Sequence, residues 1–349
     1  MDDLRNTHLV INGVPVGSGH PTYIIAEMSA NHAGDFQRAV DIIYAAKESG
    51  ADAIKLQTYT ADTLTLDCQN PPFFIESGPW KGRTMFQLYK DAYTPWEWQP
   101  RLKEVADQVG ITLFSSPFDV SSVEFLEEMK APAYKIASTE IIEHALVRRA
   151  AATSKPVIMS VGKATLGEID EAVRVALHAG AGGVALLKCT SVYPAPCSAM
   201  NLRTILHLQQ SFGVPVGLSD HSLGMGAAIA AVALGACIIE KHFILDDKIE
   251  TPDSFFSMNP VDFRNMVHEI RCVEVAMGQV DYAQVPDDSR RSLFAVREIR
   301  AGEVFAVENV RSLRPGSGLP PSSLEMILGR RARCDIKKGT PLEWEHVGG

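Results

Sequence analysis

Two histidines near the middle of the chain are the residues whose type and spacing best suit a metal site. His221 lies in the apolar segment VGLSDHS at 216–222, and His242 lies in CIIEKHF at 237–243. Residues 224–236, which are rich in glycine and alanine, indicate a helix between two strands. Neutral imidazoles at the ends of adjacent strands can bind a divalent metal and leave positions for water and substrate. The alternative is that hydrogen bonds at the strand ends satisfy both histidines.

Lysines inside apolar segments are the second group of residues that could do chemistry. Lys55 lies in AIKLQTY and Lys135 lies in AYKIAS. Burying an unpaired ammonium is expensive, so an anion is a natural partner for each lysine. Hydroxyl side chains also stand near the ends of the apolar segments, at Ser138, Ser160, Ser191 and Ser219. Lysines together with hydroxyls favour a site for a phosphate or carboxylate group.

Two carboxylates, Glu27 and Glu140, follow apolar segments in the same way. One interpretation is that each neutralises a buried lysine. The other is that one of them orients or deprotonates a reacting hydroxyl or water. The sequence alone leaves both interpretations open.

The elements that must position these residues form a repeating pattern of short apolar strands and amphipathic helices. Continuous apolar strands are typical of parallel sheets covered by helices. Eight strand-helix units in one chain predict a (β/α)8 TIM barrel, in which functional residues gather at the C-terminal ends of the strands. The eight predicted strands are YIIAEMS (23–29), AIKLQTY (53–59), TLFSSPF (112–118), AYKIAS (133–138), PVIMSVG (156–162), VALLKCT (184–190), VGLSDHS and CIIEKHF.

Two stretches depart from the repeat. Residues 8–17 predict a β-hairpin around Asn12-Gly13, placed to plug the N-terminal end of the barrel. Residues 60–98 form a long excursion without clear secondary structure. Such a long loop is usually functional or disordered, and its many aromatic side chains argue against disorder. We therefore expect it to contact substrate on the active-site side.

The pattern predicts a barrel domain with its hairpin over residues 1–278, a linker over 279–289 and a small β-rich domain over 290–349. Two similar segments, 297–310 and 334–347, make up much of the small domain.

Composition narrows the class of protein. The net charge of −9 argues against nucleic-acid binding, because Lys and Arg are not in excess. No apolar run reaches the length of a membrane span, and the first residues lack the features of a secretory signal. The six cysteines include no CxxC pair, which fits reduced thiols and a cytoplasmic location.

Seven motifs, taken in order, resemble the sialic acid synthase family: IIAEMSANHAGD, ADAIKLQTYTADT, LFSSPFD, YKIASTE, LLKCTSVYPAP, GLSDHS and EKHF. The small domain resembles the antifreeze-like (SAF) domain of that family. This resemblance covers essentially the whole chain and implies a TIM-barrel transferase. Members of the family condense phosphoenolpyruvate with an N-acylated aldose to give a nonulosonic acid. They use a divalent metal ion. This ion is Mn2+, or Mg2+ or Co2+ in place of Mn2+.

Within the family, EMSANH and the loop GPWKGRTMFQLYKDAYTPWEW are more similar to members that make pseudaminic acid. The sugar this implies is 2,4-diacetamido-2,4,6-trideoxy-L-altrose. The alternative is an enzyme that makes N-acetylneuraminate or legionaminate from a different N-acyl hexose.

The resemblance also implies roles for individual residues. His221 and His242 match the metal ligands, and Glu27, Glu140 and His242 are the expected catalytic residues. Arg314, in RPGSG, matches an arginine that reaches the partner subunit's active site, which implies a domain-swapped homodimer. Two departures are Ser191, where neuraminate enzymes commonly have Asn, and Lys188, where they often have His. The expected substrate-binding residues are Lys55, Gln57, Lys135, Ser138, Ser160, Ser191, Tyr193, Ser219, Asp253 and Arg314.

Two other classes of protein are alternatives to this interpretation. A Schiff-base aldolase that uses pyruvate would employ Lys188 as its nucleophile. A carbohydrate-binding or ice-binding protein would keep the small domain without catalysis, but the intact set of glutamates, lysines and histidines argues against it.

Overall fold

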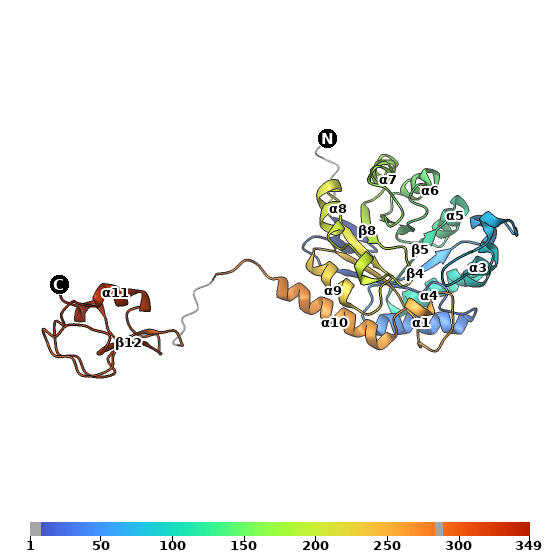
Figure 1. Ribbon diagram of the computed structural model, residues 1–349. Coiled ribbons are helices and arrows are strands. Elements are labelled where there is room, and N and C mark those ends of the chain that lie inside the picture. The colour runs from blue at the N-terminus through green and yellow to red at the C-terminus, as the bar shows by residue number, and fades with distance from the viewer. Residues whose placement is uncertain (1–7, 283–288) are drawn as a thin grey trace. The chain divides into compact units, whose positions relative to one another are not determined.

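The computed structural model describes residues 8–282 and 289–349 (Figure 1). It divides into two compact units, which meet in the sequence at residues 278 and 279. The expected linker over 279–289 includes residues 283–288, which lie outside the described residues. The first seven residues, where a secretory signal would begin, also lie outside them.

Eight parallel strands close into a barrel in the first unit, which confirms the predicted fold. The order around the barrel is β10-β3-β4-β5-β6-β7-β8-β9, so that each strand pairs with its neighbour in the sequence and the last pairs with the first. The strands are β3 (Tyr23–Glu27), β4 (Ala53–Thr58), β5 (Thr112–Pro117), β6 (Tyr134–Ile136), β7 (Val157–Ser160), β8 (Val184–Cys189), β9 (Val216–Asp220) and β10 (Ile238–His242).

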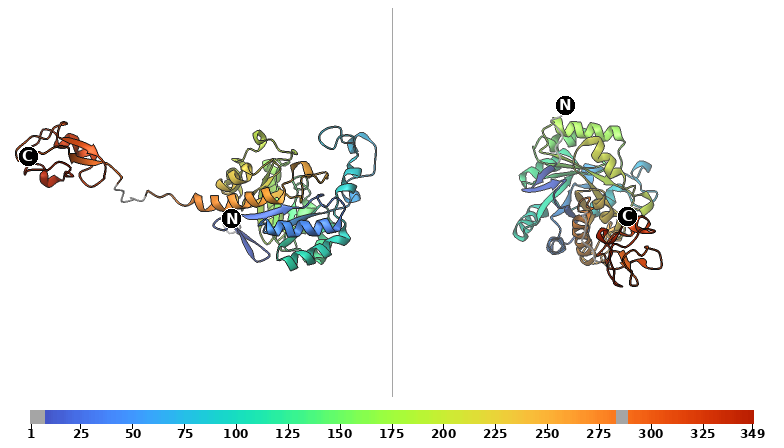
Figure 2. Two further views of the ribbon diagram at one scale, coloured as in Figure 1. Left: turned by 90° about the horizontal axis from the view of Figure 1, so that it is seen from below. Right: turned by 90° about the vertical axis from the view of Figure 1, so that its left-hand side faces the viewer.

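A helix follows each strand and packs on the outside of the barrel (Figure 1, Figure 2). The first of them, α1, begins after Asp35, whose carboxylate accepts hydrogen bonds from two backbone N–H groups of the first turn. In the described residues, no helix is long and apolar enough to cross a membrane. The helices are α1 (Phe36–Glu48), α4 (Gln99–Val109), α5 (Val120–Glu128), α6 (His144–Ala151), α7 (Leu166–His178), α8 (Thr204–Phe212), α9 (Gly226–Ala233) and α10 (Pro260–Met277).

The barrel interior changes from apolar to polar along most of the strands. On β3, the inward Ile25 is followed two residues later by Glu27, and on β4, Ala53 is followed by Lys55. Residues two apart share one face of a strand, so the apolar residue lies deeper and the polar one nearer the C-terminal end. The same change occurs from Phe114 to Ser116, Ala133 to Lys135, Ile158 to Ser160, Leu187 to Cys189 and Ile238 to Glu240.

The predicted hairpin closes the deeper, apolar end. Strands β1 (His8–Ile11) and β2 (Val14–Gly17) pair antiparallel around Asn12-Gly13. The buried side chains of Leu9, Ile11 and Val16 belong to the same apolar cluster as the inward residues of the barrel strands. The barrel interior is therefore closed at this end, and access to the polar layer comes from the opposite end.

The excursion over residues 60–98 contains more regular structure than the sequence indicated. It holds two short α-helices, α2 (Ala61–Leu64) and α3 (Met85–Ala92), and two 3-10 turns, η1 (Pro71–Phe73) and η2 (Trp96–Trp98). Thr84 caps α3 by accepting a hydrogen bond from the Gln87 backbone N–H, and the Gln87 side chain accepts one from the Thr84 N–H. The expectation of a loop without clear secondary structure was wrong, because this capping box starts a helix.

The second unit is a small β-rich fold with its own apolar core. Strands β11 (Ser292–Ala295) and β12 (Val310–Leu313) pair antiparallel, and a short helix, α11 (Leu324–Ile327), lies between the two similar segments. Ile299 and Ile336, which occupy equivalent positions in those segments, exchange two backbone hydrogen bonds of 2.9 and 2.7 Å. The two segments are thus paired with each other around one core.

Candidate active site

Two lysines and two glutamates form a buried network in the polar layer of the barrel. The Lys55 Nζ lies 2.5 Å from Glu27 Oε2 and 3.8 Å from Glu240 Oε2. The Lys135 Nζ lies 3.0 Å from Glu240 Oε1, which also accepts a hydrogen bond from the Ser219 hydroxyl at 3.0 Å. All four charged residues expose 4% or less of their surface. Each ammonium therefore has a carboxylate beside it, as buried charges require.

The two glutamates differ in their pKa. Burial raises the pKa of Glu27 above its usual range, although the Lys55 ammonium acts in the opposite direction. Burial acts on Glu240 as well, but there the Lys135 and Lys55 ammoniums outweigh it and lower the pKa. Glu240 is therefore a fixed negative charge, whereas Glu27 is the carboxylate better able to take up and release a proton. Gln57 donates a hydrogen bond of 3.0 Å to Glu27 Oε1 and holds that carboxylate in place.

The imidazoles of His221 and His242 lie edge to face at the ends of β9 and β10, with ring centres 5.3 Å apart. His221 Nδ1 lies 3.2 Å from the Thr190 carbonyl oxygen, so Nδ1 carries the proton and Nε2 is the nitrogen available to a ligand. Burial lowers the pKa of His242 well below its usual range, which keeps that imidazole neutral. Its Nδ1 is buried without a hydrogen-bond partner among the described residues and lies 3.8 Å from Asp253 Oδ2.

This pair fits a site in which the protein supplies two imidazole nitrogens. In the described part of the chain, no group of three or more His, Cys, Asp or Glu side chains is placed to hold a metal ion. Remaining ligands would have to come from water and substrate, as in metal sites that keep open positions. The unpartnered Nδ1 of His242 is consistent with this, because a buried polar atom left without a partner calls for an explanation.

Two connected cavities open onto these residues at the C-terminal end of the barrel. One, of about 700 Å3, reaches the lysines, the serines and both histidines, and we call it the polar cavity. The other, of about 430 Å3, is lined by Tyr59, Met85, Leu88, Phe256 and Asp253, and we call it the aromatic cavity. His242, Gln57, Trp80 and Tyr193 line both. The molecule thus offers a cationic, hydroxyl-rich chamber joined to an apolar, aromatic one.

Most residues that the sequence singled out lie together in this place. Those that line the polar cavity are Lys55, Gln57, Lys135, Ser138, Ser160, Ser191, Tyr193, Ser219, His221 and His242. Asp253 lines the aromatic cavity and accepts a hydrogen bond from the Ser29 hydroxyl. Glu27 lies beneath, in contact with Lys55 and Gln57.

Glu140 and Arg314 are not part of this group. Glu140 lines neither cavity, and its carboxylate accepts a hydrogen bond of 2.6 Å from the Thr139 hydroxyl. Burial raises its pKa. Arg314 is an exposed residue of the second unit. The glutamate that pairs with Lys135 is Glu240, for which the sequence pattern indicated no role.

Lys188 lies outside both cavities, on the outer face of β8. Its Nζ donates hydrogen bonds to the Cys189 carbonyl oxygen at 2.8 Å and the Thr190 hydroxyl at 2.9 Å. It lines a separate cavity of about 300 Å3 beside α7 and α8. A pyruvate adduct on Lys188 would therefore form away from the glutamates and histidines, which argues against the Schiff-base alternative.

Two tryptophans of the excursion, Trp80 and Trp96, have different surroundings. Trp80 lies over Tyr193 with ring centres 5.7 Å apart, and its indole N–H donates to the Pro252 carbonyl oxygen at 3.0 Å. Trp96 lines neither cavity. Its indole N–H donates to the Tyr59 carbonyl oxygen at 3.1 Å, and its ring packs on Phe125. Of these two side chains, only Trp80 is placed to contact a molecule in the cavities.

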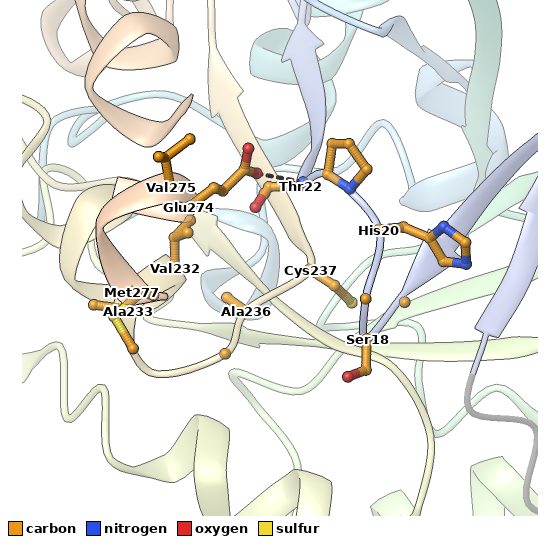
Figure 3. Close-up of a pocket in the computed structure, with 14 residues that line it drawn as sticks. Ser18, His20, Thr22, Val232, Ala233, Ala236, Cys237, Glu274, Val275 and Met277 are labelled. Carbon is orange, nitrogen blue, oxygen red and sulfur yellow. Dashed lines mark hydrogen bonds between the residues drawn. The ribbon is translucent and has the colours of Figure 1, made fainter. Parts of the chain in front are cut away.

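A further pocket at the N-terminal end of the barrel lacks comparable chemistry (Figure 3). It is lined by residues 17–22 together with parts of α9 and α10, and most of its side chains are small or apolar. Its one acidic residue, Glu274, accepts a hydrogen bond of 2.5 Å from the Thr22 backbone N–H. This carboxylate stabilises the start of β3, which is a structural role.

Comparison with known proteins agrees with the fold. A model of the NeuB family matches residues 42–282, and a SAF domain model matches residues 290–348. The chain therefore belongs to the NeuB family, which confirms the resemblance drawn from its motifs.

Individual relatives extend the match over nearly the full chain. A pseudaminic acid synthase of Campylobacter jejuni is 45% identical over 92% of this chain and 95% of its own. An N,N'-diacetyllegionaminic acid synthase of Legionella pneumophila is 37% identical over 97% and 98%, respectively. Among solved structures, an N-acetylneuraminic acid synthetase from Leptospira borgpetersenii in complex with citrate superposes with a TM-score of 0.72, at 30% identity. That match covers 80% of this chain and 93% of the other.

Proposed function

We propose that this chain is a pseudaminic acid synthase. It condenses phosphoenolpyruvate with 2,4-diacetamido-2,4,6-trideoxy-L-altrose and releases pseudaminic acid and phosphate. The observation that carries this proposal is the 45% identity to a pseudaminic acid synthase, against 37% to a legionaminic acid synthase of similar coverage. The paired cavities support it, because the reaction needs one anionic and one neutral substrate side by side.

The two substrates divide between the cavities by their chemistry. Phosphoenolpyruvate carries a carboxylate and a phosphate, and the polar cavity supplies Lys55, Lys135 and several hydroxyls for them. The N-acylated sugar presents hydroxyls, amides and apolar carbon faces, which suit the aromatic cavity with Asp253. His242 lines both cavities, so the carbon–carbon bond would form beside it.

The reaction proceeds by attack of the phosphoenolpyruvate C3 on the aldehyde carbon of the open-chain sugar. Positive charge develops at C2, water adds there, and phosphate leaves with cleavage of the C–O bond. Lys55 and Lys135 hold the donor within reach of the aldehyde. Glu27, whose pKa is raised by burial, takes the proton of the attacking water, and Gln57 keeps its carboxylate oriented.

His221 and His242 would hold a divalent metal ion, Mn2+ in the first instance. Such an ion supplies Lewis acidity to the aldehyde oxygen when it is bound. The fixed tautomer of His221 and the neutral state of His242 suit both imidazoles to this role.

We also propose that the enzyme is a homodimer in which Arg314 serves the partner's active site. Arg314 is exposed and lies in the loop RPGSG, where its guanidinium could donate to the acyl oxygen of the sugar. Subunit complementation tests this arrangement. Arg314→Ala protein is mixed with Glu27→Ala protein under conditions where subunits exchange. In a swapped dimer one of the two sites then carries neither defect, so part of the activity returns. No recovery despite demonstrated exchange contradicts the swap.

The function itself is tested by supplying one acceptor at a time. Phosphate release and the product mass are measured with the L-altrose derivative and with the acceptors of the neuraminate and legionaminate enzymes. Separate incubations matter, because isomeric acceptors give products of equal mass. We expect kcat/KM for the L-altrose derivative to exceed the others by at least about a hundredfold, a difference of about 2.7 kcal/mol. A higher kcat/KM for another acceptor would overturn the assignment.

A further inference from the structure

Three lysines line the polar cavity, and two of them already have carboxylate partners. Lys55 lies 2.5 Å from Glu27, and Lys135 lies 3.0 Å from Glu240. With all four groups charged, this buried set has no net charge. The third lysine, Lys163, is an exposed residue that lines the same cavity. In the described residues, it takes part in no ion pair within 4.0 Å.

The charge of the donor makes this third lysine important. Phosphoenolpyruvate brings a carboxylate and a phosphate into a cavity whose deep cations are already balanced. A balanced set offers hydrogen bonds, but it supplies little net attraction to a highly charged anion. An additional ammonium at the opening adds positive potential to that of a metal ion held by His221 and His242. The residues that line the polar cavity include no arginine that could take its place.

The backbone places Lys163 beside the hydroxyls of the cavity. The N–H of the preceding residue, Gly162, donates a hydrogen bond of 3.1 Å to the Ser138 hydroxyl. A Cβ on Gly162 would lie 2.7 Å from the Ser191 Oγ and 2.9 Å from the Cys189 carbonyl oxygen. Only glycine allows this close approach of the β7 exit to β8. Lys163 thus follows a tightly packed turn at Gly162, which lies between Ser138 and Ser191.

Lys163 also lies on the donor side of the site. It lines the polar cavity, whereas the aromatic cavity has no lysine among the described residues that line it. Ser138, Ser160 and Ser191 surround the same region, and the Ser160 hydroxyl has no hydrogen-bond partner among the described residues. Hydroxyls with a nearby ammonium are the groups that bind phosphate oxygens.

We propose that Lys163 binds the phosphate group of phosphoenolpyruvate at the opening of the polar cavity. This inference rests on the proposed function, because it takes phosphoenolpyruvate as the donor. Lys163 remains in contact with the phosphate while the C–O bond breaks, and it holds the anion until release. The role belongs to binding more than to chemistry, so its loss raises the donor KM and leaves the acceptor KM unchanged.

The test compares Lys163→Met and Lys163→Arg with the wild type. We expect Lys163→Met to raise the KM for phosphoenolpyruvate about tenfold, which is about 1.4 kcal/mol, with kcat changed less than about twofold. Lys163→Arg should keep most of the donor affinity, because it keeps the charge. Lys248→Met serves as the matched control. It removes an exposed lysine near the end of β10 that lines neither cavity.

Two small anions identify the group that Lys163 contacts. Inorganic phosphate and pyruvate are each measured as inhibitors competing with phosphoenolpyruvate. We expect Lys163→Met to weaken inhibition by phosphate about tenfold, the same loss as for the donor, and to leave inhibition by pyruvate unchanged. Weaker inhibition by pyruvate alone would overturn the assignment to phosphate. A raised KM for the sugar alone would place Lys163 on the acceptor instead.

Failure of this inference differs from failure of the proposed function. If the wild type releases no phosphate from phosphoenolpyruvate with any acceptor, the proposed function is wrong. If the wild type turns over normally and Lys163→Met has an unchanged donor KM and phosphate inhibition, the inference about Lys163 alone is wrong.

Discussion

Lys135 and Glu240 form an ion pair across the barrel interior, with 3.0 Å between Nζ and Oε1. Their strands, β6 and β10, lie on opposite sides of the closed strand order. The ion pair of Glu240 therefore links strands on opposite sides of the site. The second carboxylate oxygen of Glu240 lies 3.8 Å from the Lys55 Nζ. One carboxylate thus orients both lysines that face the donor.

Replacement of Glu240 by Gln should destabilise the fold, because it leaves the buried ammonium of Lys135 without its charge partner. We expect the free energy of unfolding to fall by about 3–5 kcal/mol. Urea denaturation measures this change, and Glu128→Gln, at an exposed position of α5, is the control. A loss below about 1 kcal/mol, the range of exposed ion pairs, would show that the pair contributes little.

The metal proposal predicts loss of turnover in His221→Ala and in His242→Ala, with the fold retained. Each change removes one of the two nitrogens that the barrel can offer. Metal analysis after dialysis against Mn2+ should find the ion in the wild type and not in either variant. His207→Ala, which alters an exposed histidine of α8, should keep both metal and activity. Full activity after extensive chelation would contradict the proposal.

Trp80 and Trp96 form a matched pair for the excursion. Trp80→Ala should raise the sugar KM about tenfold, equivalent to one aromatic contact of about 1.4 kcal/mol. Trp96→Ala should instead lower stability by about 3 kcal/mol, because its ring packs on Phe125, and should change neither KM greatly. Steady-state kinetics and thermal unfolding separate the two effects. Equal changes in both KM values for Trp80→Ala, with lower stability, would assign Trp80 a packing role.

His32 should make stability depend on pH. It is buried, its Nδ1 accepts a hydrogen bond from the Gly34 N–H, and its Nε2 lies 3.2 Å from the Thr94 hydroxyl. Burial lowers the pKa of His32 from 6.5 to about 4. Between pH 6.5 and about 4, His32 is therefore protonated in the unfolded chain and neutral in the folded chain. The stabilisation is complete above pH 6.5 and is lost as the pH falls towards 4.

Urea denaturation between pH 7 and pH 4 measures this effect. The His32 contribution to the free energy of unfolding should decline by about 1.4 kcal/mol per pH unit, or about 3 kcal/mol in all. His32→Gln should remove that part of the slope, whereas His20→Gln, at an exposed position, should keep it. An identical slope in the wild type and His32→Gln would assign the pH dependence to other groups.

The barrel and most of its site could be predicted, because every second side chain of a strand points into the barrel. That rule places Lys55 and Gln57 on one face of β4 and both histidines at strand ends. The role of Glu240 was missed because its partners lie on strands distant in the sequence. The capping box of Thr84 and Gln87 is a local signal for the start of α3, but it lies within an otherwise irregular stretch. The position of Lys163 depends on packing at Gly162, which the sequence pattern does not reveal.

We propose that phosphoenolpyruvate and the L-altrose derivative join with cleavage of the C–O bond of the donor. The most direct measurement is mass spectrometry of both products after reaction in water labelled with oxygen-18. We expect pseudaminic acid together with phosphate that carries no label, because the phosphate keeps its original oxygens when the C–O bond breaks. Labelled phosphate would mean cleavage of the P–O bond and contradict the mechanism, and absence of a nonulosonic acid product would contradict the function.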